Sequence, residues 1–79
     1  MNPKEPLRFN EAAYIDGFGE RMRAQRETAG LTQHALAKRS AVNRSTIAML
    51  EAGRQHPTFV QIARIAKALG LSATELIGF

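Results

Sequence analysis

Cysteine is absent from this 79-residue chain, and its absence narrows the chemistry that the chain can perform. Without thiols, neither a disulfide framework nor a thiolate metal site can form. The only imidazoles belong to His34 and His56, and two histidines alone do not complete a structural zinc site. We therefore expect no bound metal and no cofactor.

Long apolar runs are also missing. No stretch approaches the ~20 apolar residues of a membrane span, and residues 1–14 lack the apolar core of a signal peptide. The chain shows no nucleophile with a base and an orienting group, no paired carboxylates and no phosphate-cradling glycine loop. We therefore expect a soluble cytoplasmic protein that is not an enzyme and that has neither a membrane partner nor a small-molecule ligand.

Acidic residues are scarce in the middle of the chain. Between Thr32 and Lys67 the only acid is Glu51, and six positive residues minus this one acid leave the segment at +5. The six are Lys38, Arg39, Arg44, Arg54, Arg64 and Lys67. Such a basic segment in a small domain is typical of a protein that binds a polyanion, although a solvated basic surface would give the same count.

Helix start and stop signals predict an all-α bundle of about five short helices. Residues 1–9 are interpreted as a flexible tail, and residues 10–79 as one domain. Each predicted helix follows a residue that suits the N-cap, and these are Asn10, Thr32, Asn43, Thr58 and Ser72. Glycines end three helices at Gly30, Gly53 and Gly70. The predicted helices span residues 11–29, 33–40, 44–52, 59–69 and 73–77.

Apolar spacing indicates the buried face of the first and fourth helices. In the first, this face comprises Phe18, Met22 and Ala29, extended by Ile15 and Gln25. Gly17 and Gly19 each weaken that helix by about 1 kcal/mol relative to alanine, which leaves a break there open, with Asp16 as an alternative cap. In the fourth helix the face comprises Phe59, Ile62, Ile65, Ala66 and Leu69.

The second and third helices are joined by only about three residues, and so tight a link forces a large angle between them. This arrangement is a helix-turn-helix unit over about residues 32–52. Apolar residues stand where it needs them, at Ala37, Val42, Ile47 and Leu50. With these positions buried, the opposite stripe of the third helix must face away from the core, and it comprises Arg44, Ser45, Ala48, Met49 and Ala52.

An outward stripe of mixed polarity suits the major groove of DNA, where base edges offer acceptors, donors and the thymine methyl group. Arg44 can make a bidentate contact with guanine, and Ser45 can reach either donors or acceptors. Ala48 and Met49 can pack against a methyl group. Asn43 caps the helix, and the N–H groups beside it favour a phosphate.

Several motifs together resemble the Cro/repressor-type helix-turn-helix family, the lambda-repressor-like fold, over about residues 15–77. They are R-x-x-x-G-L-T-Q at 26–33, alanine at 37, S-T-I-x-x-L-E-x-G-R at 45–54, proline at 57 and I-A-x-A-L-G at 65–70. The resemblance implies a bacterial or phage transcription regulator that binds double-stranded DNA at near-palindromic operators as a dimer. One position departs from the family pattern. The turn position that is usually glycine is Ala41 in this chain, and an alanine in the left-handed conformation costs about 1–2 kcal/mol.

The resemblance also assigns roles to single residues. The base-reading positions are those of Arg44, Ser45, Ala48 and Met49. Gln33 is expected to contact a phosphate and to brace the recognition helix, and the other backbone contacts are expected at Thr32, Asn43, Thr46 and Arg54. Arg26 and Glu51 match a pair that joins the first and third helices and orients the latter without touching DNA.

The chain's two ends leave alternatives open. Leu76, Ile77 and Phe79 either form a dimer contact, as in the family, or close the core. The tail, with Leu7 and Phe9, either packs across a dimer, reaches toward DNA through Lys4 and Arg8, or stays disordered.

The leading hypothesis is a minimal, homodimeric transcription regulator, such as a Cro-like repressor or a restriction–modification controller. The alternative is a protein-interaction module that uses the same fold, for example an antitoxin that binds a toxin, or a coactivator that contacts the transcription machinery. A stoichiometric protein partner would favour the alternative.

Overall fold

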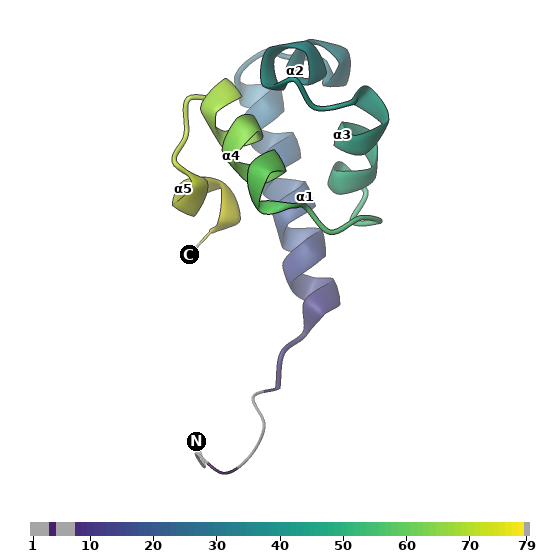
Figure 1. Ribbon diagram of the computed structural model, residues 1–79, viewed down its shortest axis with the longest axis vertical. Coiled ribbons are helices and arrows are strands. Elements are labelled where there is room, and N and C mark those ends of the chain that lie inside the picture. Colours follow the sequence, from purple (N-terminus) through teal and green to yellow (C-terminus); the bar gives the residue numbers. More distant parts are fainter. Residues whose placement is uncertain (1–3, 5–7, 79) are drawn as a thin grey trace.

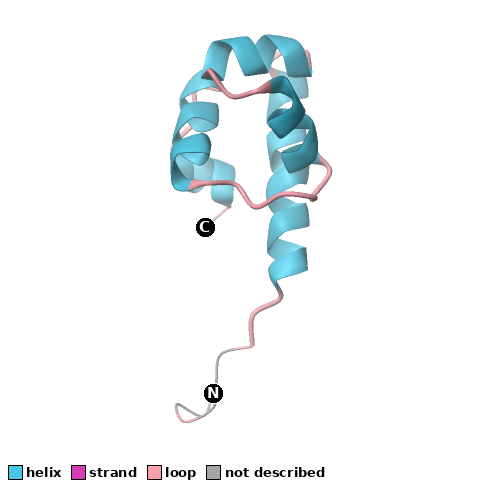
Figure 2. Ribbon diagram, turned by 45° about the vertical axis from the view of Figure 1, so that its right-hand side comes forward, coloured by secondary structure: helices cyan, strands magenta, loops and turns pink. Residues whose placement is uncertain are grey.

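The computed structural model describes residue 4 and residues 8–78, and this part of the chain folds into five helices and no strand (Figures 1 and 2). The helices are α1 (Glu11–Thr28), α2 (Gln33–Ser40), α3 (Arg44–Glu51), α4 (Phe59–Ala68) and α5 (Ala73–Ile77). α1 is the longest, and its first turns project beyond the other helices (Figure 1). The predicted all-α class is confirmed.

Local side-chain chemistry sets the helix boundaries. All five predicted N-caps accept a hydrogen bond from a backbone N–H of the first turn. Thr58 and Ser72 additionally form complete capping boxes with Gln61 and Glu75. These bonds satisfy donors that have no partner within the helix, so the chain enters each helix at a defined residue.

α1 runs unbroken through Gly17 and Gly19, so the predicted option of a break there is wrong. The reason lies in a tertiary contact at Gly19, which is buried against the end of α3. A Cβ atom at this position would lie 2.5 Å from the carbonyl oxygen of Leu50 and 2.8 Å from that of Glu51. Gly19 therefore lets the backbones of α1 and α3 approach more closely than any other residue would allow.

We expect Gly19→Ala to lower the free energy of unfolding by about 2 kcal/mol, because the added methyl group overpacks a contact made by backbone carbonyls. Gly17→Ala is the matched control. Its Cβ would meet the flexible Arg21 side chain at 3.3 Å, so alanine there should stabilise the helix by up to about 1 kcal/mol. Urea unfolding followed by circular dichroism measures both variants. Equal stability of the two would contradict the close-approach role of Gly19.

The hydrophobic core lies between α1, α2, α3 and the two C-terminal helices. Its buried apolar residues are Phe18, Met22, Leu36, Ala37, Val42, Ile47, Leu50, Ile65, Ala66 and Leu76. The four helix-turn-helix positions predicted to be buried are all among them. Gln25 and Ala29 are exposed, contrary to prediction, because the buried side of α1 continues from Met22 to Arg26 and Ala29 is already the C-cap.

α4 departs from the predicted face at its first residue. Ile65 and Ala66 are buried, and Ile62 and Leu69 pack against the core, but the Phe59 side chain is 85% exposed. Phe59 directly follows the N-cap, at a point where α4 has not yet reached the core. The prediction that it faces inward is therefore wrong.

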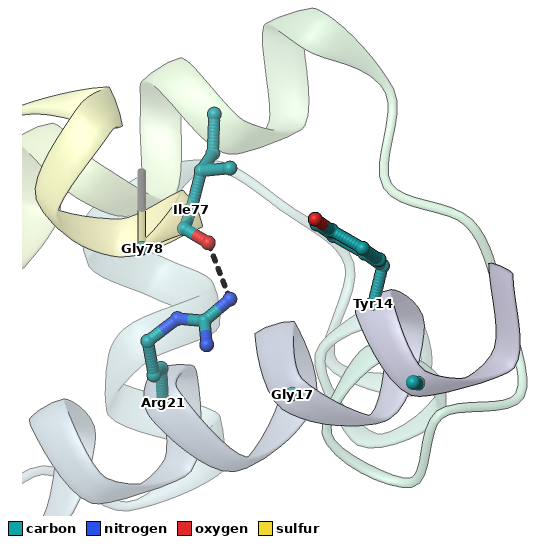
Figure 3. A pocket seen from close by; sticks show the side chains of 6 residues that line it. Tyr14, Gly17, Arg21, Ile77 and Gly78 are labelled. Atoms are coloured by element: carbon teal, nitrogen blue, oxygen red, sulfur yellow. Dashed lines mark hydrogen bonds between the residues drawn. The ribbon is translucent and has the colours of Figure 1, made fainter. Parts of the chain in front are cut away.

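α5 closes the core and is fastened to α1. Leu76 is fully buried, so of the two predicted alternatives it closes the core and is not a dimer contact. Ile77 is half-buried, and Phe79 lies outside the described residues. The Arg21 guanidinium donates through Nε to the carbonyl oxygen of Leu76 at 3.1 Å and through Nη2 to that of Ile77 (Figure 3). These bonds satisfy carbonyl groups at the C-terminal end of a short helix.

Candidate nucleic-acid interface

α3 presents a polar stripe to solvent because its other side is anchored in the core. Ile47 and Leu50 are fully buried, and the residues between them turn outward by helical periodicity. Arg44, Ser45 and the 39%-exposed Met49 lie on the surface, with Ala48 half-buried beside them. The structure thus brings the predicted base-reading residues together on one exposed helix face.

Asn43 caps the start of α3 and also orients the hydroxyl group of Ser45. Its Oδ1 accepts the backbone N–H of Ser45 at 2.9 Å and the Ser45 hydroxyl at 2.7 Å. The hydroxyl proton of Ser45 is therefore directed at its neighbour, and its oxygen lone pairs remain to accept. The sequence prediction left Ser45 open as donor or acceptor, and the structure favours acceptor.

Glu51 ties three helices together at the C-terminal end of α3. Its carboxylate receives Arg26 Nε at 2.7 Å, Arg26 Nη2 at 2.9 Å and Gln33 Nε2 at 3.2 Å. The remaining terminal nitrogen of Arg26 donates to the carbonyl oxygen of Leu31 at 2.8 Å. The Arg26 and Glu51 side chains are only 12% and 4% exposed. A bidentate pair of this geometry fixes direction as well as distance, so it sets the orientation of α3.

The contacts with Glu51 also keep Arg26 charged and let Gln33 brace α3. The hydrogen bond with Glu51 raises the pKa of Arg26 above its usual value, against the opposing effect of burial, so the guanidinium stays charged. Gln33 of α2 reaches the same carboxylate and braces the third helix as expected. Its contact with a phosphate stays a prediction.

The turn between α2 and α3 contains the one non-glycine residue with a positive φ in the described part of the chain. Ala41 has φ 56° and ψ 33°, the left-handed conformation anticipated for the position that is usually glycine. Its carbonyl oxygen accepts a hydrogen bond from Arg64 Nη1 of α4 at 3.3 Å. The next residue, Val42, is buried and holds the turn against the core.

Ala41→Gly is expected to raise the free energy of unfolding by about 1 kcal/mol, because glycine adopts the left-handed region without the steric cost of a Cβ atom. Ala35→Gly, inside α2, is the matched control and should lower it by about 1 kcal/mol. Chemical denaturation measures the free energy of unfolding of each variant and so distinguishes the expected increase from the expected decrease. A destabilised Ala41→Gly variant would show that the turn is not strained.

A groove between α2 and α3 adds His34 and Lys38, two residues to which the sequence analysis assigned no DNA contact. It has a volume of about 500 Å³ and is lined by His34, Ala37, Lys38, Ala41, Val42, Asn43 and Arg44. His34 and Lys38 are four residues apart on α2 and therefore share one side of it. That spacing was the signal available in the sequence. Together with Arg44 they make this groove suited to an anion.

The expected backbone-contact residues lie at the ends of the two helices. Thr32 caps α2, where its Oγ1 accepts the N–H of Ala35 at 3.0 Å. Thr46 is half-buried in the first turn of α3, and the exposed Arg54 follows the end of that helix, with its N–H bonded to the Met49 carbonyl at 2.9 Å.

Residue 4 and residues 8–78 contain no cluster of three or more histidine, aspartate or glutamate side chains that could hold a metal ion. None of their helices has the length and apolar character to cross a membrane.

The fold and the outward stripe of α3 define a helix-turn-helix protein, and known proteins agree. A family model described as a helix-turn-helix domain matches residues 18–76. An uncharacterized helix-turn-helix-type transcriptional regulator of Methanothermobacter thermautotrophicus is 49% identical over 49 residues, which cover 62% of this chain and 71% of that protein. The immunity repressor protein of Bacillus phage phi105 is 33% identical over 60 residues, which cover 76% of this chain and 42% of the repressor.

A solved structure gives the same result. The restriction-modification controller protein C.AhdI from Aeromonas hydrophila superposes with a TM-score of 0.79 at 36% identity, over 81% of this chain and 97% of that chain. The chain therefore belongs to the Cro/repressor-type helix-turn-helix family of transcription regulators.

Proposed function

We propose that this transcription regulator binds double-stranded DNA sequence-specifically by placing α3 in the major groove. The observation that carries the proposal is the stripe of Arg44, Ser45 and Met49, exposed on a helix that Glu51 holds rigidly in place. Arg44 stands in the first turn of α3, where a cation opposes the helix dipole. A residue kept in a locally unfavourable place indicates a functional role.

Each residue of the stripe has a distinct role in this proposal. Arg44 donates to O6 and N7 of a guanine. Ser45 accepts from the exocyclic amino group of adenine or cytosine, because its own proton is held by Asn43. Met49 and Ala48 pack against a thymine methyl group.

Contacts with the DNA backbone position α3 in the groove. We assign them to Gln33, Thr32, Thr46 and Arg54, and add His34 and Lys38 from the groove beside α3. The side chain of Asn43 is occupied as an acceptor, so only its amide N–H groups can reach a phosphate.

The proposal extends to a homodimer in the cytoplasm that acts without a catalytic step and without a small-molecule ligand. Two copies would occupy the halves of an inverted repeat, and a two-fold axis in the protein would match that of the operator.

Selection of binding sites from random duplex DNA tests the proposal. An enriched inverted repeat with half-sites about one helical turn apart is the expected result. Affinity for the selected site and for a scrambled duplex is then measured against salt concentration. If no motif is enriched and both affinities fall with the same salt dependence, the basic surface binds DNA only through its charge and the proposal is wrong. The protein-partner alternative would then be preferred.

A further inference from the structure

A second basic hollow lies between the C-terminal halves of α2 and α4. Its volume is about 300 Å³, and it is lined by Arg39, Ser40, Arg64, Lys67 and Ala68, which we call the α2–α4 patch. The three cationic side chains are exposed, whereas Ser40 and Ala68 are the last residues of their helices. α3 and α4 stand on opposite sides of the molecule (Figures 1 and 2), so this hollow is separate from the outward stripe of α3.

The helix ends require fewer cations than the patch contains. The C-terminal ends of α2 and α4 each carry about half a negative charge, which Arg39 and Lys67 complement from the last turns. Arg64 lies in the interior of α4, and its Nη1 donates to an uncharged acceptor, the carbonyl oxygen of Ala41, at 3.3 Å. The three positive charges therefore exceed the two helix ends by about two charges.

Acidic side chains do not neutralise the patch. α2 and α4 contain none, and its cations form no ion pair with any residue in the described part of the chain. The carboxylate of Glu51 is only 4% exposed and is paired with Arg26. On α1, by contrast, both signs are interspersed, and Arg23 pairs with Glu27. Interspersed charge suffices for solubility, so a field of one sign indicates attraction of a negatively charged partner.

DNA bound to α3 does not extend to this hollow without bending. His34 and Lys38 line the α2–α3 groove, whereas Arg39 is rotated from Lys38 by about 100° around α2. Arg64 and Lys67 lie on the outward side of α4, across the core from α3. A duplex would have to curve around α2 to reach them, and such a bend costs about 1–6 kcal/mol. A second copy of this basic surface is disfavoured by like charge.

We propose that the α2–α4 patch docks an acidic segment of another protein, whose aspartate and glutamate side chains meet Arg39, Arg64 and Lys67. Small residues at the two helix ends, Ser40 and Ala68, leave room between these side chains for an extended backbone. The inference goes beyond the proposed function, because it gives the DNA-bound regulator a separate surface for a protein. It rests on the proposed function only in taking α3 as the helix that binds DNA.

Binding of a fluorescently labelled oligo-glutamate peptide to the protein saturated with its selected operator tests the inference. The operator covers α3 and the α2–α3 groove, so the peptide has to bind elsewhere. Arg39→Gln combined with Lys67→Gln should raise the peptide Kd about tenfold, because two exposed ion pairs with the peptide are lost. Arg64 is kept because its hydrogen bond also supports the turn at Ala41. Fluorescence anisotropy measures the Kd.

Arg8→Gln combined with Arg23→Gln is the matched control. It removes the same charge from two exposed residues outside the patch, so the peptide Kd should change less than about twofold. Affinity of both double variants for the labelled operator is measured in parallel and should be equal.

Four results would overturn the inference. They are no binding of the peptide to the natural protein–operator complex, release of the operator by the peptide, an equal loss in both double variants, and a selective loss of operator affinity in Arg39→Gln/Lys67→Gln. The second would place the peptide on the DNA-binding surface, and the fourth would make the patch a contact for flanking DNA. Failure of the proposed function would be seen separately, as the absence of an enriched site. The two double variants would then be compared without DNA.

Discussion

Glu51→Ala should lose about 3 kcal/mol or more of the free energy of unfolding, the largest stability effect that we expect from a single truncation in this chain. The substitution removes the bidentate carboxylate partner of Arg26 in a place where the Arg26 side chain is only 12% exposed, and it leaves only the exposed Glu27 carboxylate at 4.0 Å. Removing one partner of such a pair costs about 3–5 kcal/mol, because an uncompensated charge stays out of water. The amide of Gln33 loses the same acceptor.

Glu27→Ala is the control for that prediction. Glu27 pairs with Arg23 at 2.9 Å, but both side chains are largely exposed, and surface pairs contribute about 0–1 kcal/mol. Guanidinium chloride unfolding of the two variants compares the buried and the exposed pair in one protein. If the free energy of unfolding falls by the same small amount in both variants, the Arg26–Glu51 contact between α1 and α3 contributes no more than a surface ion pair.

Removing both charges separates the energetic role of this pair from its role in orienting α3. Arg26→Leu combined with Glu51→Leu should recover much of the lost stability, because replacing a whole buried pair by apolar residues is often neutral. The recovered fold would still lack the bidentate contact that directs α3. We therefore expect the double variant to be folded but to bind its operator more weakly than the natural chain.

The helix boundaries could be predicted from the sequence because they depend on neighbours in the chain. An N-cap side chain bonds an N–H two or three residues later, so Asn10 and Thr58 reveal their helices without tertiary information. The same holds for the outward stripe of α3. Once Ile47 and Leu50 are placed in the core, helical periodicity alone directs Arg44 and Met49 to solvent.

The errors concern contacts between segments that lie far apart in the sequence. Gly19 weakens an isolated helix, and only the carbonyl oxygens of α3 that pack against it explain why glycine is there. Leu76 and Phe59 are both apolar residues near helix ends, and their local patterns do not distinguish a side chain that closes the core from one that protrudes. Their opposite exposures follow from how α5 packs against α1 and α4 and how α4 packs against α2, which helical spacing does not determine.

The candidate site also combines features that local sequence predicts with features that depend on contacts between helices. Its exposed residues followed from spacing, but the direction of the Ser45 hydroxyl depends on the rotamer of Asn43 and could not be predicted. The groove that joins Lys38 to Arg44 depends on the angle between α2 and α3, which Ala41 sets through its left-handed backbone. A turn of three residues predicts a large angle without giving its value.

Arg44→Ala should weaken binding to the selected operator by about 10- to 100-fold per half-site, because one bidentate contact with guanine contributes about 1–3 kcal/mol of discrimination. Binding to a scrambled duplex should change much less, since phosphate contacts made by other cations remain. Arg44→Lys should recover only part of the loss, because an ammonium group lacks the planar fork that matches O6 and N7 of guanine. Fluorescence anisotropy with both duplexes at one salt concentration gives the ratio of the two affinities.

Arg23→Ala is the control for Arg44, because it removes the same charge from the exposed surface of α1 while leaving α3 intact. Both variants have the same net charge, so any difference between their operator affinities reflects the position of the arginine and not the total charge of the protein. Arg44→Ala should also leave the free energy of unfolding nearly unchanged, since this exposed side chain opposes the dipole of its own helix. If Arg44→Ala weakens the operator and the scrambled duplex by the same factor, Arg44 contacts a phosphate, and the base must be read by Ser45, Met49 or a residue of the α2–α3 groove.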